Sequence, residues 1–314
     1  MNKYYKIYFI VFVVFILFIL LKVQNNILKL KIYEDFKNKN KYNTYGGSLI
    51  EKLIEKNYKI IIGDGNIPSD NMFNIYKKTF ICLRLTKHDG IANGINEAGL
   101  MGIKTLHNGD SPAAINYESL EHIIKSIENE KKKIGTIDYE LAKKTKKYLD
   151  YNPKTFLNLK RHFDEKPEIY NTEIDQLYTS DSLKFFDKVY KNQFENLKTY
   201  HNKNKPALFF GVYTNNDLNK IINHKSCGLI IWGGSDAMNS NNIKKLKHLD
   251  KKYFKHISIS EDIKNDLQNQ GIDSTRINFH AIKMNNYKPV KKGKYIYAYC
   301  PNCGIKSNIK AIEL

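Results

Sequence analysis

The chain has 314 residues, with 51 Lys and Arg against 32 Asp and Glu, and a formal net charge of +19. Its length suits about two domains and excludes a small disulfide scaffold, and its 42% of hydrophobic residues excludes wholesale disorder. The excess charge is almost entirely Lys, with Arg only at Arg84, Arg161 and Arg276. Because nucleic-acid readers favour the donor fork of Arg, we expect no nucleic-acid partner.

The first predicted element is an apolar run from Tyr4 to Val23, whose only charges are Lys6 and Lys22 near its ends. As a helix it would be roughly 30 Å long, the thickness of a bilayer core. No small-residue cleavage site follows, so we predict an uncleaved single-pass anchor at 4–23 and a Lys/Asn-rich tether at 24–44. A buried core helix or a signal peptide are the alternatives. The Lys residues after the span favour a cytosolic location for the remainder of the chain.

Residues 45–150 alternate short apolar runs with helical patterns, which implies a parallel sheet with helices on its faces. We expect helices at 45–56, 70–78, 91–101 and 117–133, and strands at 58–62, 80–85 and 103–107.

Residues 151–204 are rich in Lys, Tyr and Phe, and we predict that they form a helical connector. A second alternating pattern begins at 205 and continues to 314, with strands expected at 207–213, 227–234, 253–260 and 276–282. The fold class is therefore α/β with two Rossmann-like lobes. Ligands bind at the carboxyl ends of parallel strands, so the turn residues of the second lobe are candidates to line a cleft, although structural turns would also explain them. These residues are Gly211, Gly233, Gly234, Ser235 and Asp236.

Of the four cysteines, Cys82 and Cys227 lie in apolar runs and are expected to be buried. Cys300 and Cys303 form a CxxC pair that suits half of a zinc ribbon, a redox pair or two incidental thiols. The sequence contains no second CxxC pair to complete a zinc site, so we expect no metal.

The most specific stretch is LRLTKHDGIANGINEAGLMGIKTLHNG at 83–109, which carries Asp89 and Glu97. A glycine-containing turn leads from a strand into a helix, so free backbone amides lie beside two carboxylates. The amides suit phosphate, and the carboxylates suit sugar hydroxyls. A nucleotide-sugar carries both groups, and we predict such a ligand. His88 in the same turn is more typical of a loop side chain than of a catalytic base.

This stretch resembles the donor-binding core of the GT-B glycosyltransferases of the retaining group 1 type, whose signature is a Glu, seven residues and a second Glu followed by Ala. Here it is Asp89, seven residues, then Glu97 and Ala98, and IIGDGN upstream is similar to the family's strand-Gly-x-Gly element. The resemblance implies that Asp89 faces the transferred sugar and that Glu97 binds the ribose. It further implies donor-binding roles for Gly63, Gly65, Arg84, Lys87, Gly90, Ile91, Ala92 and Asn93.

The chain departs from the family in two ways. Asp89 is one methylene shorter than the usual Glu, and the donor-like lobe precedes the acceptor-like lobe. A lone strand at 294–300 would be the natural first strand of the donor lobe, so the chain resembles a circular permutation. We therefore expect 295–299 to pair beside 58–62. A fragment of a longer tandem protein is the alternative.

These features predict a membrane-anchored glycosyltransferase that moves a sugar from a nucleotide-sugar to a glycan, lipid or protein acceptor, with retention implied by the resemblance and without a cofactor. Three rivals stay open. One is a nucleotide-sugar epimerase on the same fold, and another is a degenerate, non-catalytic nucleotide-sugar-binding module at the membrane. The third is a polybasic module that binds anionic lipids or nucleic acid.

Overall fold

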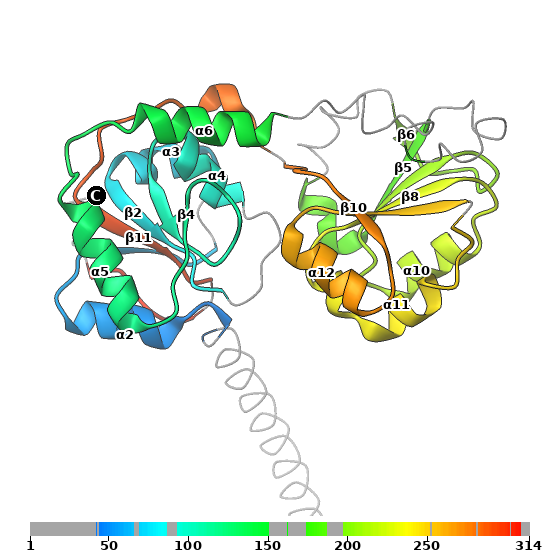
Figure 1. Cartoon of the computed structure of the whole chain (residues 1–314), viewed down its shortest axis with the longest axis horizontal. Helices are drawn as coiled ribbons and strands as arrows, with labels where there is room; N and C mark the ends of the chain where they lie inside the picture. The colour runs from blue at the N-terminus through cyan, green and yellow to red at the C-terminus, as the bar shows by residue number, and fades with distance from the viewer. Residues whose placement is uncertain are drawn as a thin grey trace, which may run out of the picture.

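Two lobes, each built on a parallel sheet, make up the part of the chain that the computed structural model describes (Figure 1). The described residues are 42, 44–65, 69–86, 93–150, 162, 174–186, 197–251, 253–280, 282–301 and 303–308. The expected anchor at 4–23 and nearly all of the tether at 24–44 lie outside these residues. Among the described helices, none has both the length and the apolar composition to cross a membrane.

The first lobe contains most of residues 45–150 and one strand from the end of the chain. Its strands are β1 (Ile60–Gly63), β2 (Thr79–Leu83), β3 (Lys104–Leu106), β4 (Ala114–Ile115) and β11 (Tyr295–Tyr299). Its helices are α2 (Gly47–Glu55), α3 (Ser69–Lys77), α4 (Asn93–Leu100), α5 (Leu120–Lys131) and α6 (Tyr139–Leu149). All five strands are parallel, in the spatial order β1-β11-β2-β3-β4.

The C-terminal strand β11 lies between β1 and β2, with Ile296 opposite Ile60 on one side and Ile81 on the other. The pairing expected for 295–299 beside 58–62 is thus confirmed. If the strands are counted from β11, the order becomes 2-1-3-4-5, which is a common order in doubly wound α/β domains. The topological switch point of this sheet then falls between β11 and β2.

Alternating side chains of β11 contribute to two different cores, which explains why the strand belongs at the centre of the sheet. Ile296 and Ala298 pack with residues of α2 and α5, whereas Tyr295 and Tyr297 pack with residues of α3 and α4. Figure 1 shows α2 and α5 on one side of the sheet, and α3 and α4 on the other. A strand with both faces apolar is stable only where helices cover both faces.

The second lobe contains six parallel strands in the order β10-β9-β8-β7-β5-β6. They are β5 (Gln176–Thr179), β6 (Lys198–Thr199), β7 (Ala207–Phe210), β8 (Gly228–Trp232), β9 (Phe254–Ser258) and β10 (Ser274–Arg276). Helices α10 (Asn215–Ile222), α11 (Ser240–Leu246) and α12 (Glu261–Asn269) connect β7 through β10. Each helix joins neighbouring parallel strands, and right-handed crossovers place all three helices on one face of the sheet (Figure 1).

The prediction of a helical connector at 151–204 is wrong at 176–179 and 198–199, whereas Asp181–Phe186 do form a short 3-10 helix, η2. Residues 176–179 and 198–199 form β5 and β6, and β5 pairs with β7 with Gln176 opposite Ala207. A run as short as Gln-Leu-Tyr-Thr has little strand signal of its own. Its conformation is set by the exposed edge of β7, against which Leu177 and Tyr178 also pack into the core. Residues 151–161, 163–173 and 187–196 lie outside the described part.

The last strand of the second lobe was expected at 276–282, but β10 covers Ser274–Arg276, so only Arg276 belongs to both. Beyond it the chain crosses to the first lobe, where Asn278 Nδ2 donates to the Tyr148 carbonyl at 3.0 Å and His280 Nε2 lies 2.9 Å from the Leu149 carbonyl. These carbonyls belong to the end of α6, where helix carbonyls lack intrahelical partners. Residues 278–280 therefore join the lobes rather than extend the sheet.

Candidate functional site

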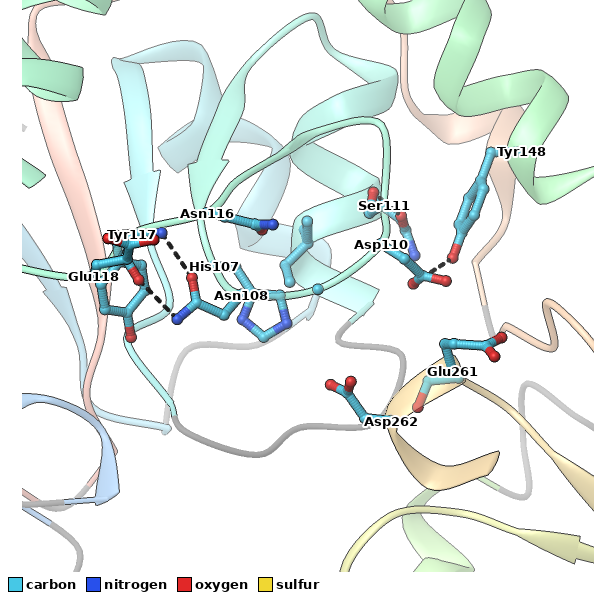
Figure 2. A pocket seen from close by; sticks show the side chains of 14 residues that line it. His107, Asn108, Asp110, Ser111, Asn116, Tyr117, Glu118, Tyr148, Glu261 and Asp262 are labelled. Carbon is cyan, nitrogen blue, oxygen red and sulfur yellow. Dashed lines mark hydrogen bonds between the residues drawn. The ribbon is translucent and has the colours of Figure 1, made fainter. Parts of the chain in front are cut away.

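A pocket of about 500 Å³ lies where the two lobes face each other (Figure 2). One wall is made by the loops that follow β3 and β4 and by α4, with Tyr148 from the end of α6. The other wall is the first turn of α12 in the second lobe. The lining residues are Ile95, Asn96, His107, Asn108, Gly109, Asp110, Ser111, Asn116, Tyr117, Glu118, Tyr148, Ser260, Glu261 and Asp262.

The wall from the first lobe is held in place by its own polar side chains. Asn108 Nδ2 donates to the Tyr117 carbonyl at 2.9 Å, and its Oδ1 accepts from the Tyr117 amide at 2.7 Å, which ties together the loops after β3 and β4. Ser111 Oγ donates to Asn96 Oδ1 at 2.8 Å and so fixes the same loop to α4. These contacts shape the pocket before any ligand binds.

The wall from the second lobe is the start of α12. Ser260 caps the helix by accepting from the Ile263 amide at 3.3 Å, and Glu261 and Asp262 occupy the first turn. Carboxylates are favourable at this end of a helix because they complement its dipole. In Figure 2, Glu261 and Asp262 lie across the pocket from the loop that carries Asn108 and Asp110.

Arg276 at the end of β10 bridges the two lobes beside the pocket. It forms an ion pair with Asp110 of the first lobe and lies 3.6 Å from Glu261 of its own lobe. Arg276 Nη2 also donates to the Tyr148 hydroxyl at 3.3 Å, and that hydroxyl lies 3.1 Å from Asp110 Oδ1. One guanidinium thus contacts three residues that line the pocket.

The lining is polar and acidic. Asp110, Glu118, Glu261 and Asp262 contribute carboxylates, and the described lining residues include no Lys or Arg. Amides and hydroxyls from Asn96, Asn108, Asn116, Ser111, Tyr117 and Tyr148 supply both donors and acceptors. This combination matches a ligand with many hydroxyl groups and does not match a bare anion.

Glu97 lies on α4, one residue beyond the pocket-lining Asn96, and is not itself part of the lining. Its carboxylate accepts from the Tyr76 hydroxyl at 3.2 Å. Burial raises the pKa of Glu97, while hydrogen bonds with Tyr287 and Tyr76 and the positive charge of Arg84 act in the opposite direction. The structure therefore places Glu97 in a polar aromatic niche that faces β11.

Three other predicted donor-binding residues lie at the carboxyl edge of the first sheet. Gly63 ends β1, where a Cβ atom would collide with the Tyr297 hydroxyl, and Gly65 has a φ of 91° beside Pro301. Arg84 follows β2, and its guanidinium carbon lies 4.3 Å from the centroid of the Tyr299 ring at the end of β11. The carboxyl ends of β1 and β2, the two neighbours of β11, thus carry Gly63, Gly65 and Arg84.

The remaining predicted donor-site residues fall mainly in a segment that the structure does not describe. Lys87, His88, Asp89, Gly90, Ile91 and Ala92 lie outside the described residues, while Asn93 begins α4. The expected relation between Asp89 and Glu97 stays a prediction.

The candidate cleft residues of the second lobe lie at the carboxyl ends of β7 and β8. Asp236 is almost fully buried, and its carboxylate accepts from the amides of Val212, Gly233, Gly234 and Ala237 at 2.8–3.1 Å. Gly211, with a φ of 82°, ends β7 nearby. None of Gly211, Gly233, Gly234, Ser235 and Asp236 lines the pocket described above.

Sequence reasoning missed most of the residues that line this pocket. Asn108 and Gly109 end the stretch at 83–109 without a predicted role, and Ser260 is the last residue of the strand expected at 253–260. The rule that ligands bind at the carboxyl ends of parallel strands would have indicated 107–111 once β3 was predicted. No sequence pattern indicated that Tyr148 would line a pocket, because its position depends on how the end of α6 packs against the rest of the molecule.

Comparison of the chain with models of known protein families, with curated proteins and with solved structures finds no match. The function must therefore be argued from the geometry of the site.

Proposed function

We propose that the chain is a glycosyltransferase that takes a sugar from a nucleotide-sugar donor and transfers it to a hydroxylated acceptor. The observation that carries this proposal is the pocket of about 500 Å³ between two parallel α/β lobes, at the carboxyl ends of β3 and β4. Its volume falls in the range of small-molecule sites, and its position is where α/β folds bind ligands.

The lining favours a ligand with hydroxyl groups, such as a sugar, over an anionic ligand. Carboxylates such as Asp110 and Asp262 accept hydrogen bonds from hydroxyls, while the amides of Asn96 and Asn116 accept and donate. An acidic pocket would oppose a diphosphate by charge repulsion. We therefore place the sugar and the acceptor hydroxyl in the pocket and the diphosphate toward Arg84.

Arg84 is well situated for that role. The carbonyl of Arg84 lies 3.2 Å from His107 Nδ1, which connects it to the pocket wall, and stacking on Tyr299 holds its guanidinium. A preorganised cation stabilises the charge that develops on a leaving diphosphate. Catalysis would then consist mainly of positioning and electrostatic stabilisation, with the resemblance adding Asp89 near the transferred sugar.

The membrane anchor predicted at 4–23 would add a location to this proposal. It would hold both lobes near a bilayer, on the cytosolic side if the Lys residues after the span act as expected. Lipid-linked and membrane-bound acceptors are then within reach of the pocket.

Calorimetric titration of the full-length chain with a panel of nucleotide-sugars tests the proposal. We expect at least one donor to bind, and Glu118→Gln together with Asp262→Asn to weaken binding at least tenfold. Glu55→Gln on α2, which removes an exposed carboxylate far from the pocket, is the matched control. Absence of binding across the panel would sink the proposal.

A transfer assay separates the enzyme from its nearest rival. Release of nucleoside diphosphate in the presence of acceptor sugars supports the transferase. Donor binding without turnover would assign the chain to the non-catalytic binding modules.

A further inference from the structure

A second hollow lies on the far edge of the second lobe. It has a volume of about 580 Å³ and is bounded by residues 200–204 and by the outer face of α10. The loop 200–204 precedes the amino end of β7, whereas Ser260 follows the carboxyl end of β9. Because these strands are parallel, the hollow and the interlobe pocket lie at opposite edges of the sheet.

The loop side of the hollow is rigidly held by one buried side chain. Gln176 Oε1 accepts from the amides of His201 and Asn202, both at 3.1 Å. Gln176 Nε2 donates to the carbonyls of Asn202 and Lys205 at 2.6 and 2.9 Å. A ligand that binds against this loop would not have to order it first, which lowers the entropic cost of binding.

The helix side presents unused amides. Asn216, Asn219 and Asn223 are exposed on one face of α10, and within the described part of the chain their side chains have no hydrogen-bond partner. The helix is stabilised without them, by the capping box of Thr214 and Asp217 and by buried residues on its other face. Amides that donate and accept suit the hydroxyls of a saccharide.

The charge of this hollow is opposite to that of the interlobe pocket. Lys203 and Lys220 line it, and no Asp or Glu is among its described lining residues. Asp175, which is near the loop, lies 3.4 Å from Lys205 Nζ in an ion pair. An anionic group is therefore favoured here, whereas the interlobe pocket disfavours one.

A nucleic acid fits these observations less well. Tyr200 is the aromatic residue of the lining, and its ring packs against Phe209 and His224 with centroid distances of 5.4 and 5.8 Å. It is thus committed to the core, whereas single-stranded nucleic acids bind through aromatic rings that are free to stack on bases. The lining also contains no Arg.

We propose that this hollow binds a segment of an acidic saccharide, with the lysines on its carboxylate or phosphate and the asparagine amides on its hydroxyls. The site is separate from the interlobe pocket, so it does not depend on which reaction that pocket performs. It would hold an acidic polymer on the protein at a distance from the interlobe pocket.

Calorimetry on the full-length chain tests this site with an oligomer of galacturonic acid and the neutral galactose oligomer of equal length. We expect the acidic oligomer to bind at least tenfold more tightly than the neutral one. The double variant Asn219→Ala/Lys220→Gln should lose at least tenfold in affinity for the acidic oligomer. Lys203→Gln should lose at least threefold, and it should leave the loop intact because Lys203 contributes to the loop through its backbone. Lys244→Gln on α11 is the matched control and should bind as the unchanged chain does.

Equal affinity for the two oligomers, or equal effects of the hollow and control variants, would overturn the proposal. Tighter binding of a short oligothymidylate than of the acidic oligomer would also overturn it and assign the hollow to nucleic acid. Titration of the same variants with nucleotide-sugars keeps the two sites apart, because none of these substitutions touches the interlobe pocket.

Discussion

At the scale of single residues, Glu97 is the one predicted donor-site carboxylate that the structure describes. It is partly buried beside Tyr76 and Tyr287, and burial raises its pKa. A raised carboxyl pKa means that the folded state binds the proton more tightly than the unfolded chain does. The ionised group therefore reduces the free energy of unfolding at neutral pH, a cost that appears as pH rises above the ordinary value of 4.5.

Substitution Glu97→Gln should remove this cost while keeping an oxygen that can accept from Tyr76. We expect the variant to match or exceed the unchanged chain in free energy of unfolding at pH 8 and to lose that advantage at pH 4. If Glu97 binds the ribose, as the resemblance implies, the same variant binds nucleotide-sugars more weakly. Urea unfolding at the two pH values and calorimetry measure the two effects. The quantity to compare is the free energy of unfolding of the variant minus that of the unchanged chain. A value of this difference that is smaller at pH 8 than at pH 4 would contradict the argument.

At the scale of elements, the C-terminal segment after β11 turns back along the outer edge of β1. Cys300 and Cys303, the CxxC pair, form a disulfide at this turn. The Ile60 amide then donates to Asn308 Oδ1 at 2.8 Å, and the Ile62 amide donates to Ser307 Oγ at 2.9 Å. Side chains of the tail thus satisfy donors that an edge strand would leave open.

Reduction of this disulfide should loosen the tail more than it destabilises the lobe. A loop this short is expected to contribute about 2 kcal/mol to the free energy of unfolding. We expect dithiothreitol to lower stability by about this amount and to speed hydrogen exchange at the amides of Ile60 and Ile62. The double variant Cys300→Ser/Cys303→Ser should show no response to the reductant. Unchanged exchange at both amides after reduction would count against the role of the turn.

At the scale of the whole molecule, polar contacts join the two lobes within the described part of the chain. Arg276 of the second lobe pairs with Asp110 of the first, and Asn278 and His280 reach the end of α6. The side chains of Arg276 and Asp110 are 28% and 39% exposed, so water weakens their attraction. Such an interface permits movement of one lobe against the other, which suits a pocket that has to admit and release ligands.

Substitution Arg276→Ala should let the lobes separate. We expect a larger radius of gyration by small-angle X-ray scattering, and a coupling of about 1 kcal/mol between Arg276 and Asp110 in a double-mutant cycle. Lys264→Ala is the matched control, because Lys264 also lies 3.6 Å from Glu261 but within the same helix. Identical scattering profiles for Arg276→Ala and the unchanged chain would refute this bridging role.

The α/β architecture and its two parallel sheets follow from local patterns in the sequence. Apolar runs such as 58–62 and 227–234 are too short for helices and too apolar for surface strands, so both of their faces must be covered. The partner of β11 was expected from the family resemblance, in which a lone strand at 295–299 would be the first strand of the donor lobe. Periodicity and apolar content depend on neighbours along the chain, which is why they can be read from it.

The pocket and its bridge were decided by the tertiary structure alone. Asp110, Tyr148 and Glu261 lie far apart along the chain, and no sequence motif links them. They converge because the ends of α6 and β10 meet where the two lobes face each other. The strand β5 likewise exists because the edge of β7 accepts it, not because Gln176 to Thr179 favour it. The local sequence pattern of a segment predicts which of its own side chains can be buried. Where distant polar groups meet depends on packing between elements, which no single segment of the sequence encodes.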